Sequence, residues 1–445
     1  MARDRDTPNP FRFPSALVRR ARRRLRNRLA AHWNDRAATW MTRAEERAAR
    51  RRLRRAERLL RRAIKVTTSE RTRRHFYLNL SLLLQQRHEL SLRGDPLEAG
   101  EAVTAARRAL AGLSTEEEWW CAALCTLADA LLLVHTTGTG TEAQLEEAVH
   151  CMVRAVADAP RGSDELPALI VRLGNALERS ADSGTDIEAL DRAFDAARRA
   201  VAEAPGEARS MARFALAEAL CSVASAADWT AALDEGIEIY RDIAPEFSPD
   251  SGVLHALGTA LLLRDEAEND PEAVAEGLRV LREAVSVTVP GSTQQHAVEQ
   301  DLAAALHTSY EHNGNSAFLD EAITLLRTTV DATPSGEPVL TLRRLRLAIA
   351  LDARATRTGE PDDAREALDL LTRALADSVA EEDDEEHASV LLALANTLLT
   401  LGELTGEPGL VPKAISYLRT AAQTATGTLL QVRIYSSLVL QRCLP

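Results

Sequence analysis

Four side chains that are close in the sequence have the chemistry of metal ligands. Cys121 and Cys125 are one helical turn apart, and His150-Cys151 follows in the next helical pattern. Thiolate sulfur and imidazole nitrogen are ligands that tetrahedral zinc prefers. The two pairs are nevertheless expected near opposite ends of two antiparallel helices, several turns apart and too far for one zinc ion. We therefore predict buried structural cysteines and no metal.

Other patterns with possible chemistry are weaker. The segment 136–141 is rich in Gly and Thr but has no Lys and no preceding strand, so we interpret it as a loop between helices and not as a phosphate-binding loop. His307 and His312 have no evident nucleophile or carboxylate partner. The chain has no nucleophile elbow and no His-Glu-x-x-His metal motif. The sequence predicts a protein that is not an enzyme and has no cofactor.

Composition indicates which elements carry these residues. The chain has 445 residues, of which 45% are hydrophobic and only 4% are aromatic. Its abundant Ala, Leu, Glu and Arg are strong helix formers, whereas a β-rich protein would contain more Val, Ile, Tyr and Thr. A chain of this length exceeds most single hydrophobic cores. We expect an all-α protein built as several domains or as a repeat array.

Two patterns recur at spacings of 41 to 47 residues and favour the repeat array. Both place apolar residues at helical spacing, so we predict that they mark helices A and B of a repeating antiparallel hairpin. The first, Leu-x-x-small-Leu, begins at Leu80, Leu127, Leu173, Leu216, Leu257, Leu302, Leu347 and Leu394, and more weakly at Leu438. The second, small-x4-Arg-x-Ala with some departures, begins at Ala56, Ala102, Ala148, Ala193, Gly236, Gly277, Ala322, Ala367 and Ala414.

The repeats resemble the tetratricopeptide repeat (TPR). Leu173-Gly174 and Leu257-Gly258 match its Leu-Gly pair in helix A, and the helix-B series of small and large residues ending in Pro is matched by Ala148, Met152, Ala155 and Pro160. The resemblance covers roughly residues 45 to 445 and implies a right-handed α-solenoid of about nine antiparallel helix pairs. An armadillo or HEAT-type solenoid has a similar period, but the helix-B spacing of small residues and Pro argues against it.

The repeats are longer than the typical TPR of 34 residues. In this they are similar to degenerate arrays that accompany caspase-like (CHAT) peptidase domains in actinobacterial proteins. The chain ends in helix A of a ninth unit, so no such peptidase domain is expected to follow.

Charge divides the chain into two parts. Residues 1–75 carry a formal charge of +18 and the remainder −30, which together give the net charge of −12. We predict an Arg-rich helical arm or cap over residues 1–45 and the TPR-like solenoid over 46–445. The basic residues singled out are Arg19, Arg20, Arg23, Arg24, Arg26, Arg28, Arg51, Arg54 and Arg58. Through residues 1–62 this region could cover the first repeat, or bind nucleic acid, an anionic membrane or an acidic protein surface, including the chain's own solenoid.

The TPR resemblance also implies which residues line a binding groove, because helices A of such arrays form the concave face. The residues that follow each Leu-Gly-like pair, with two neighbours, would face the groove: Asp129, Asn175, Glu178, Glu218, Thr259, Asp352 and Asn396. This lining is acidic to neutral. We therefore expect a partner peptide or protein that carries Arg or Lys.

The function that the sequence favours is a protein-interaction scaffold or adaptor. The alternative is a nucleic-acid-binding regulatory protein that uses the basic arm. Homo-oligomerisation is compatible with either. No signal peptide and no transmembrane segment are evident, and the odd number of cysteines suits free thiols, so we expect a cytoplasmic protein.

Overall fold

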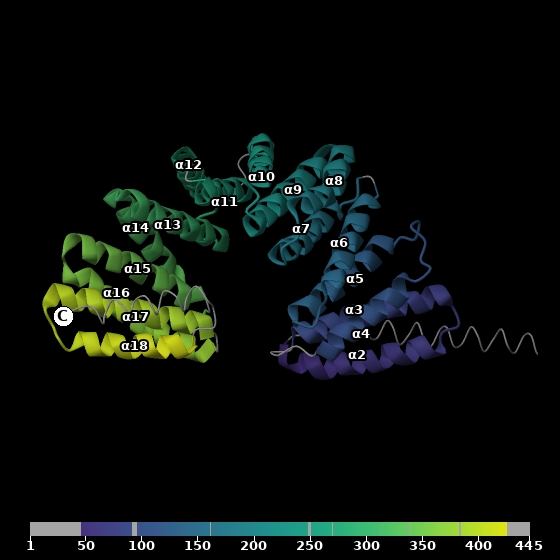
Figure 1. The fold of residues 1–445 in the computed structure, drawn as a ribbon, viewed down its shortest axis with the longest axis horizontal. Coiled ribbons are helices and arrows are strands. Elements are labelled where there is room, and N and C mark those ends of the chain that lie inside the picture. The colour runs from purple at the N-terminus through teal and green to yellow at the C-terminus, as the bar shows by residue number, and fades with distance from the viewer. Residues whose placement is uncertain are drawn as a thin grey trace, which may run out of the picture. The chain divides into compact units, whose positions relative to one another are not determined.

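The described part of the chain is helical throughout. The structure, a computed structural model, describes residues 46–90, 96–160, 162–247, 251–268, 270–337, 339–381 and 384–424. Within these ranges it contains seventeen helices and no strand (Figure 1). The all-α prediction is confirmed. Contacts divide the chain into two compact units, residues 1–239 and 240–445, and each is described by itself.

The first unit contains α2 (Glu46–Val66), α3 (Glu70–Glu89), α4 (Pro96–Leu110), α5 (Trp120–Thr136), α6 (Glu142–Ala157), α7 (Leu166–Asp182), α8 (Ile187–Glu203), α9 (Gly206–Ala227) and most of α10 (Thr230–Ile243). The second unit contains the end of α10 and α11 (Ser251–Glu268), α12 (Pro271–Val287), α13 (Thr293–Asn313), α14 (Ser316–Ala332), α15 (Val339–Thr358), α16 (Pro361–Glu381), α17 (Asp384–Thr405) and α18 (Leu410–Thr424).

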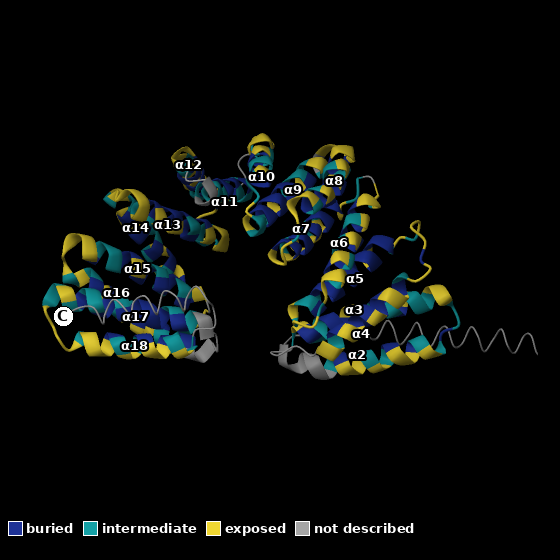
Figure 2. Cartoon of the chain, in the orientation of Figure 1, coloured by how far each residue is buried: buried dark blue, intermediate teal, exposed yellow. Residues whose placement is uncertain are grey.

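The two sequence patterns fall on alternate helices. Every Leu-x-x-small-Leu pattern from Leu80 to Leu394 lies on an odd-numbered helix, which is helix A, and every second pattern lies on an even-numbered helix B. Leu438 lies outside the described residues. In most repeats helix A packs mainly on the helix B that follows it, as α11 does on α12 and α15 on α16, whereas α7 packs mainly on α9, the next helix A. Figure 2 shows the result, with buried and exposed faces on the same helices. The predicted helix pairs are confirmed.

Helix boundaries follow from local chemistry. The carboxylate of Asp270 accepts hydrogen bonds from the backbone N–H of Glu272 and Ala273 at 3.0 and 3.2 Å, and Pro271 is the first residue of α12. Such a cap satisfies amides that have no partner within the helix, and Pro lacks that amide. Gly314 ends α13 with a φ of 71°, a conformation that Gly adopts without strain.

Small residues allow particular helices to approach closely. A Cβ atom on Gly174 of α7 would lie 2.6 Å from the Cβ of Ala219 on α9. In the second unit, a Cβ on Gly258 of α11 would lie 2.6 Å from Cγ of Leu281 on α12. Carbon atoms normally approach to about 3.5–4.0 Å, so a side chain at either position would force the helices apart. The Gly of the Leu-Gly pair is therefore required by packing.

Successive B helices are joined by ion pairs, which we call the B-helix ladder. An Arg five residues after the small residue of one helix B pairs with a Glu directly before the small residue of the next. Its members in the first unit are Arg61–Glu101, Arg107–Glu147 and Arg198–Glu235, and in the second Arg241–Glu276, Arg282–Glu321 and Arg327–Glu366. Five of these, all but Arg61–Glu101, are bidentate.

The B-helix ladder is interrupted at two junctions, where both the Arg and the Glu are absent. Val153 and Thr372 occupy the Arg position there, and the position that otherwise holds Glu in the next helix B holds Arg192 and Lys413. A Glu therefore occurs where an Arg precedes it and is replaced by a cation where none does. Exposed ion pairs each stabilise by only about 0–1 kcal/mol, so their main effect is to favour one register of neighbouring repeats.

One helix departs from the expectation that no stretch is apolar enough for a membrane. Residues Glu386–Thr405 of α17 are long and apolar enough to span one by length and composition. More than half of this stretch is buried inside the protein. Leu391 and Leu398 pack with Leu418 of α18 in a hydrophobic cluster of the second unit. Its apolar character is accounted for by this core position.

Candidate functional site: the A helices and a cleft between α11, α12 and α13

The predicted groove residues lie on the A helices and differ in exposure. Asn175, Glu218 and Thr259 are exposed, whereas Asp129, Glu178, Asp352 and Asn396 are partly buried. Three of the partly buried residues are carboxylates that contact the next helix A. Arg172 donates to Asp129 at 2.9 Å, the Ser222 hydroxyl donates to Glu178 at 2.7 Å, and the Thr400 hydroxyl donates to Asp352 at 3.3 Å.

Asp352 is the most perturbed of these carboxylates. Burial raises its pKa to about 6, and the hydroxyls of Thr400 and Thr397 act in the opposite direction. Its Oδ1 atom is buried and accepts no hydrogen bond. A carboxyl group in this environment binds a proton more readily than an exposed carboxylate does.

The basic arm lies largely outside the described residues, including Arg19, Arg20, Arg23, Arg24, Arg26 and Arg28. Arg51 falls within α2, and Arg54 and Arg58 are exposed on the same helix. Nε of Arg58 lies 3.4 Å from the backbone oxygen of Arg54. A cationic helix surface is therefore present at the start of the first unit, and its role stays a prediction.

The described cysteines lie inside the helix packing of the first unit, and Cys443 lies outside the described residues. Cys121, Cys125, Cys151 and Cys221 are free and buried. Burial raises the pKa of the Cys125 and Cys221 thiols to about 12 and that of Cys151 to about 11. Since the thiolate is the nucleophile and the metal ligand, these groups are unreactive near neutral pH. Among the described residues, no three His, Cys, Asp or Glu side chains are placed to hold a metal ion.

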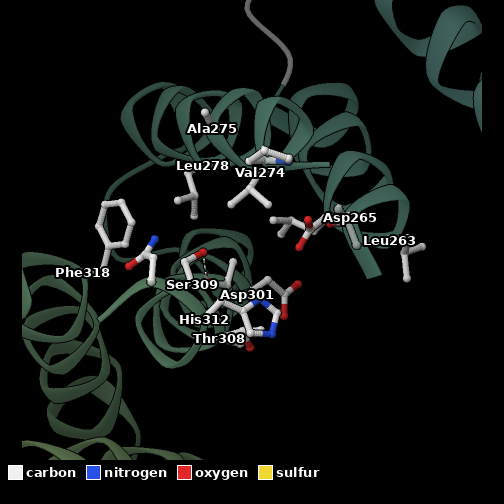
Figure 3. Close-up of a pocket in the computed structure, with 16 residues that line it drawn as sticks. Leu263, Asp265, Val274, Ala275, Leu278, Asp301, Thr308, Ser309, His312 and Phe318 are labelled. Atoms are coloured by element: carbon white, nitrogen blue, oxygen red, sulfur yellow. Dashed lines mark hydrogen bonds between the residues drawn. The ribbon is translucent and has the colours of Figure 1, made fainter. Parts of the chain in front are cut away.

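The second unit contains a cleft of about 720 Å³ between α11, α12 and α13, and Phe318 of α14 also lines it. We call it the α11–α13 cleft (Figure 3). Val274 and Leu278 of α12 form one wall, and Ala305 and Ser309 of α13 contribute to the opposite one. Binding pockets for ligands have volumes of about 300–1,000 Å³, largely apolar walls and a few polar groups. The α11–α13 cleft meets all three criteria.

The carboxylates of the cleft come from α11 and α13. In Figure 3, Asp265 of α11 lies across the cleft from Phe318. Asp301 and His312 both line the cleft from α13, but roughly 16 Å of helix axis separates them. Nε2 of His255 is 2.8 Å from Oδ2 of Asp301. The Asp301 side chain remains 46% exposed, so its carboxylate is accessible from solvent. The cleft therefore combines apolar walls with two carboxylates that lie at different levels along the helices.

Of the predicted groove residues, only Thr259 lines the α11–α13 cleft. The first unit contains a smaller cavity of about 190 Å³ near Pro160 and Gly162, and none of the predicted residues lines it. The sequence reasoning missed Asp265, Asp301 and Phe318. Asp265 and Phe318 are close to the A-to-B turns, and Asp301 lies directly before the motif residue Leu302.

No family model matches the chain, and no curated protein matches it in sequence. Among solved structures it is similar to nearly identical TPR-like repeats of a predicted kinesin light chain from Podosopora anserina, with 18% identity over 49% of this chain and 98% of that one and a TM-score of 0.35. It is also similar to the apo form of the quorum sensor NprR from B. thuringiensis, with 14% identity, 86% and 98% coverage and a TM-score of 0.40. BtubC (BKLC) from P. vanneervenii is 16% identical over 53% of this chain and 92% of that one, with a TM-score of 0.37.

The TPR-like architecture follows from the helix pairs themselves. Alternating A and B helices, a Leu-Gly pair at a close helix approach and a period of 41 to 47 residues are all present in the described chain. The resemblance to the TPR is confirmed at the level of the fold. The association with caspase-like peptidase arrays stays a prediction.

Proposed function

We propose that the protein is a non-enzymatic scaffold that binds a segment of another protein. The observation that carries the proposal is the α11–α13 cleft, whose volume and mixed lining suit a bound group. Seven of its lining residues are exposed, including Ala275, Ala304 and Thr308, so the cleft is open along its length. An open cleft admits a chain that enters and leaves it, which favours a polypeptide segment over an enclosed small molecule.

The charge of the chain supports a basic partner. The sequence after residue 75 carries a formal charge of −30, and Asp265 and Asp301 add accessible carboxylates at the cleft. Complementary charge speeds encounter and selects among partners more than it adds affinity. In the first unit, the exposed Asn175 and Glu218 of α7 and α9 are proposed as additional contacts for the same class of partner.

The test is a selection of peptides from a random displayed library on the immobilised full-length protein. We expect enrichment of Arg- or Lys-bearing peptides that bind saturably, with affinity that falls as salt rises. Hydrogen–deuterium exchange of the complex should show protection in α11, α12 and α13. If no peptide binds saturably to the full-length chain, the proposal is wrong.

The alternative function is nucleic-acid binding through the basic arm. Binding assays on the same full-length protein can test it. Arg54 and Arg58, exposed on α2, are the described part of that arm. Phosphate contacts make the binding constant fall steeply with salt. Tight, salt-sensitive binding of DNA or RNA that is lost when residues 1–45 are deleted would favour the alternative. Peptide binding that survives the deletion favours the scaffold.

A further inference from the structure

We propose that the α11–α13 cleft recognises a two-part motif in its partner: a large apolar side chain seated beside Phe318, and a nearby Arg or Lys whose cation meets Asp265. The inference rests on the proposed scaffold function and specifies the chemistry of the segment that the scaffold binds. It is carried by a comparison between two successive repeats of the second unit.

In the repeat that follows the cleft, an arginine bridges two B helices. Arg354 lies seven residues after the motif residue Leu347 of α15. Its Nε and Nη2 atoms donate to Asp363 of α16 at 2.7 and 2.8 Å, and its Nη1 atom lies 3.3 Å from Oδ1 of Asp320 on α14. In the first unit, Arg87 has the same position after Leu80 and pairs with Glu98, which corresponds to Asp363.

One repeat earlier, all three members of this charged triad are replaced. Ser309 has the position of Arg354, Ala275 that of Asp320, and Phe318 that of Asp363. Each of the three replacements lines the α11–α13 cleft. Where the next repeat has a long guanidinium side chain and two carboxylates, this repeat has two small side chains and one aromatic ring. The cleft lies where the neighbouring repeat places its own arginine.

The replacements define what could bind there. Phe318, Leu278 and Val274 make one part of the cleft apolar, so burying an apolar side chain against them is favourable. Asp265 lies across the cleft from Phe318, where a partner cation would find its partly exposed carboxylate (Figure 3). A segment with both features matches both parts of the cleft at once.

The test uses four short fluorescein-labelled peptides in a Gly/Ser background, which carry Phe-x-Arg, Phe-x-Gln, Ala-x-Arg or Ala-x-Gln. Fluorescence anisotropy with the full-length protein should show tightest binding for the Phe-x-Arg peptide, and each single replacement should weaken it by about tenfold. Two variants probe the cleft separately. Ala275→Leu fills its apolar part, and Asp265→Asn removes the charge that would face the partner cation.

Each variant has a matched control away from the cleft. Ala202→Leu makes the same change at an exposed position of α8, and Glu311→Gln removes a charge from an exposed position of α13 that does not line the cleft. We expect Ala275→Leu to weaken binding of both Phe peptides, Asp265→Asn to weaken only the Arg peptides, and both controls to bind as the wild type does. Circular dichroism and thermal melting identify any variant that fails to fold.

A third variant copies the neighbouring repeat into the cleft. The triple substitution Ser309→Arg, Ala275→Asp and Phe318→Asp should close it and abolish binding of the Phe-x-Arg peptide. The inference is overturned if the wild type does not prefer this peptide, or if folded Ala275→Leu and Asp265→Asn both bind it within twofold of the wild type. The library selection decides the scaffold function independently, because it does not depend on this motif.

Discussion

A single methyl group at Gly174 should have a measurable cost. In Gly174→Ala the new Cβ would lie 2.6 Å from the Cβ and 3.0 Å from the Cα of Ala219. Both atoms are fixed by the backbone of α9, so α7 and α9 must separate by roughly 1 Å to reach a normal contact. Such overpacking costs about 1–3 kcal/mol, while Ala gains about 1 kcal/mol over Gly in helix propensity. We expect a net loss of about 1 kcal/mol in the free energy of unfolding.

Gly100→Ala is the matched control, because Gly100 is an exposed residue of α4 in the same unit and a Cβ there would meet no atom within 4 Å. Only the gain in helix propensity remains, so this variant should be stabilised by about 0.5–1 kcal/mol. Urea unfolding followed by circular dichroism measures both. The sign of the effect is the decisive result: if Gly174→Ala is stabilised as much as Gly100→Ala, the close approach of α7 and α9 is wrong.

Three further predictions concern charge. Burial raises the pKa of Asp352 to about 6, so the folded state retains a proton that the unfolded state releases above about pH 4, and stability falls as pH rises from about 4 to 6. Asp352→Asn should therefore stabilise the protein at pH 7 by on the order of 1–2 kcal/mol and flatten this dependence in thermal melts; an unchanged pH profile would contradict it. A double-mutant cycle with Arg282→Ala and Glu321→Ala should give a coupling of about 0.3–1 kcal/mol at low salt that shrinks in 1 M salt, and a salt-independent coupling would contradict the ion-pair interpretation. Deletion of residues 1–30 should tighten binding of a basic peptide at low salt and change it little at high salt, if the arm competes for the same acidic surface; equal affinities at both salt levels, or complete loss of binding, would exclude competition.

The helix pairs could be predicted because they depend on local patterns. Leu173-Gly174 marks a helix A by spacing alone, and Asp270-Pro271 marks the start of a helix B by the chemistry of its backbone amides. Neither requires knowledge of a distant residue. The same locality explains why every motif leucine from Leu80 to Leu394 lies on the expected helix.

The α11–α13 cleft could not be predicted in this way, because residues from four helices line it. Ser309, Ala275 and Phe318 are unremarkable in composition, and their meaning depends on the positions that Arg354, Asp320 and Asp363 hold in the next repeat. The signal was present in the register, since Ser309 stands where Arg87 and Arg354 stand in other A helices. The contacts of Asp129 with Arg172 and of Glu178 with Ser222 also depend on how neighbouring A helices cross.

The B-helix ladder has a consequence for how such a chain could change its length. Because each pair connects only one repeat with the next, removing residues 283–327 would bring Arg282 opposite Glu366 and leave the face of B helices electrically matched. Duplicating the same segment would preserve the match equally well. A deletion that placed Arg282 next to the helix containing Lys413 would instead bring two positive charges together. The acid and base at each junction thus mark which repeats are interchangeable, and gene duplication or an engineer could insert or delete whole repeats at those points.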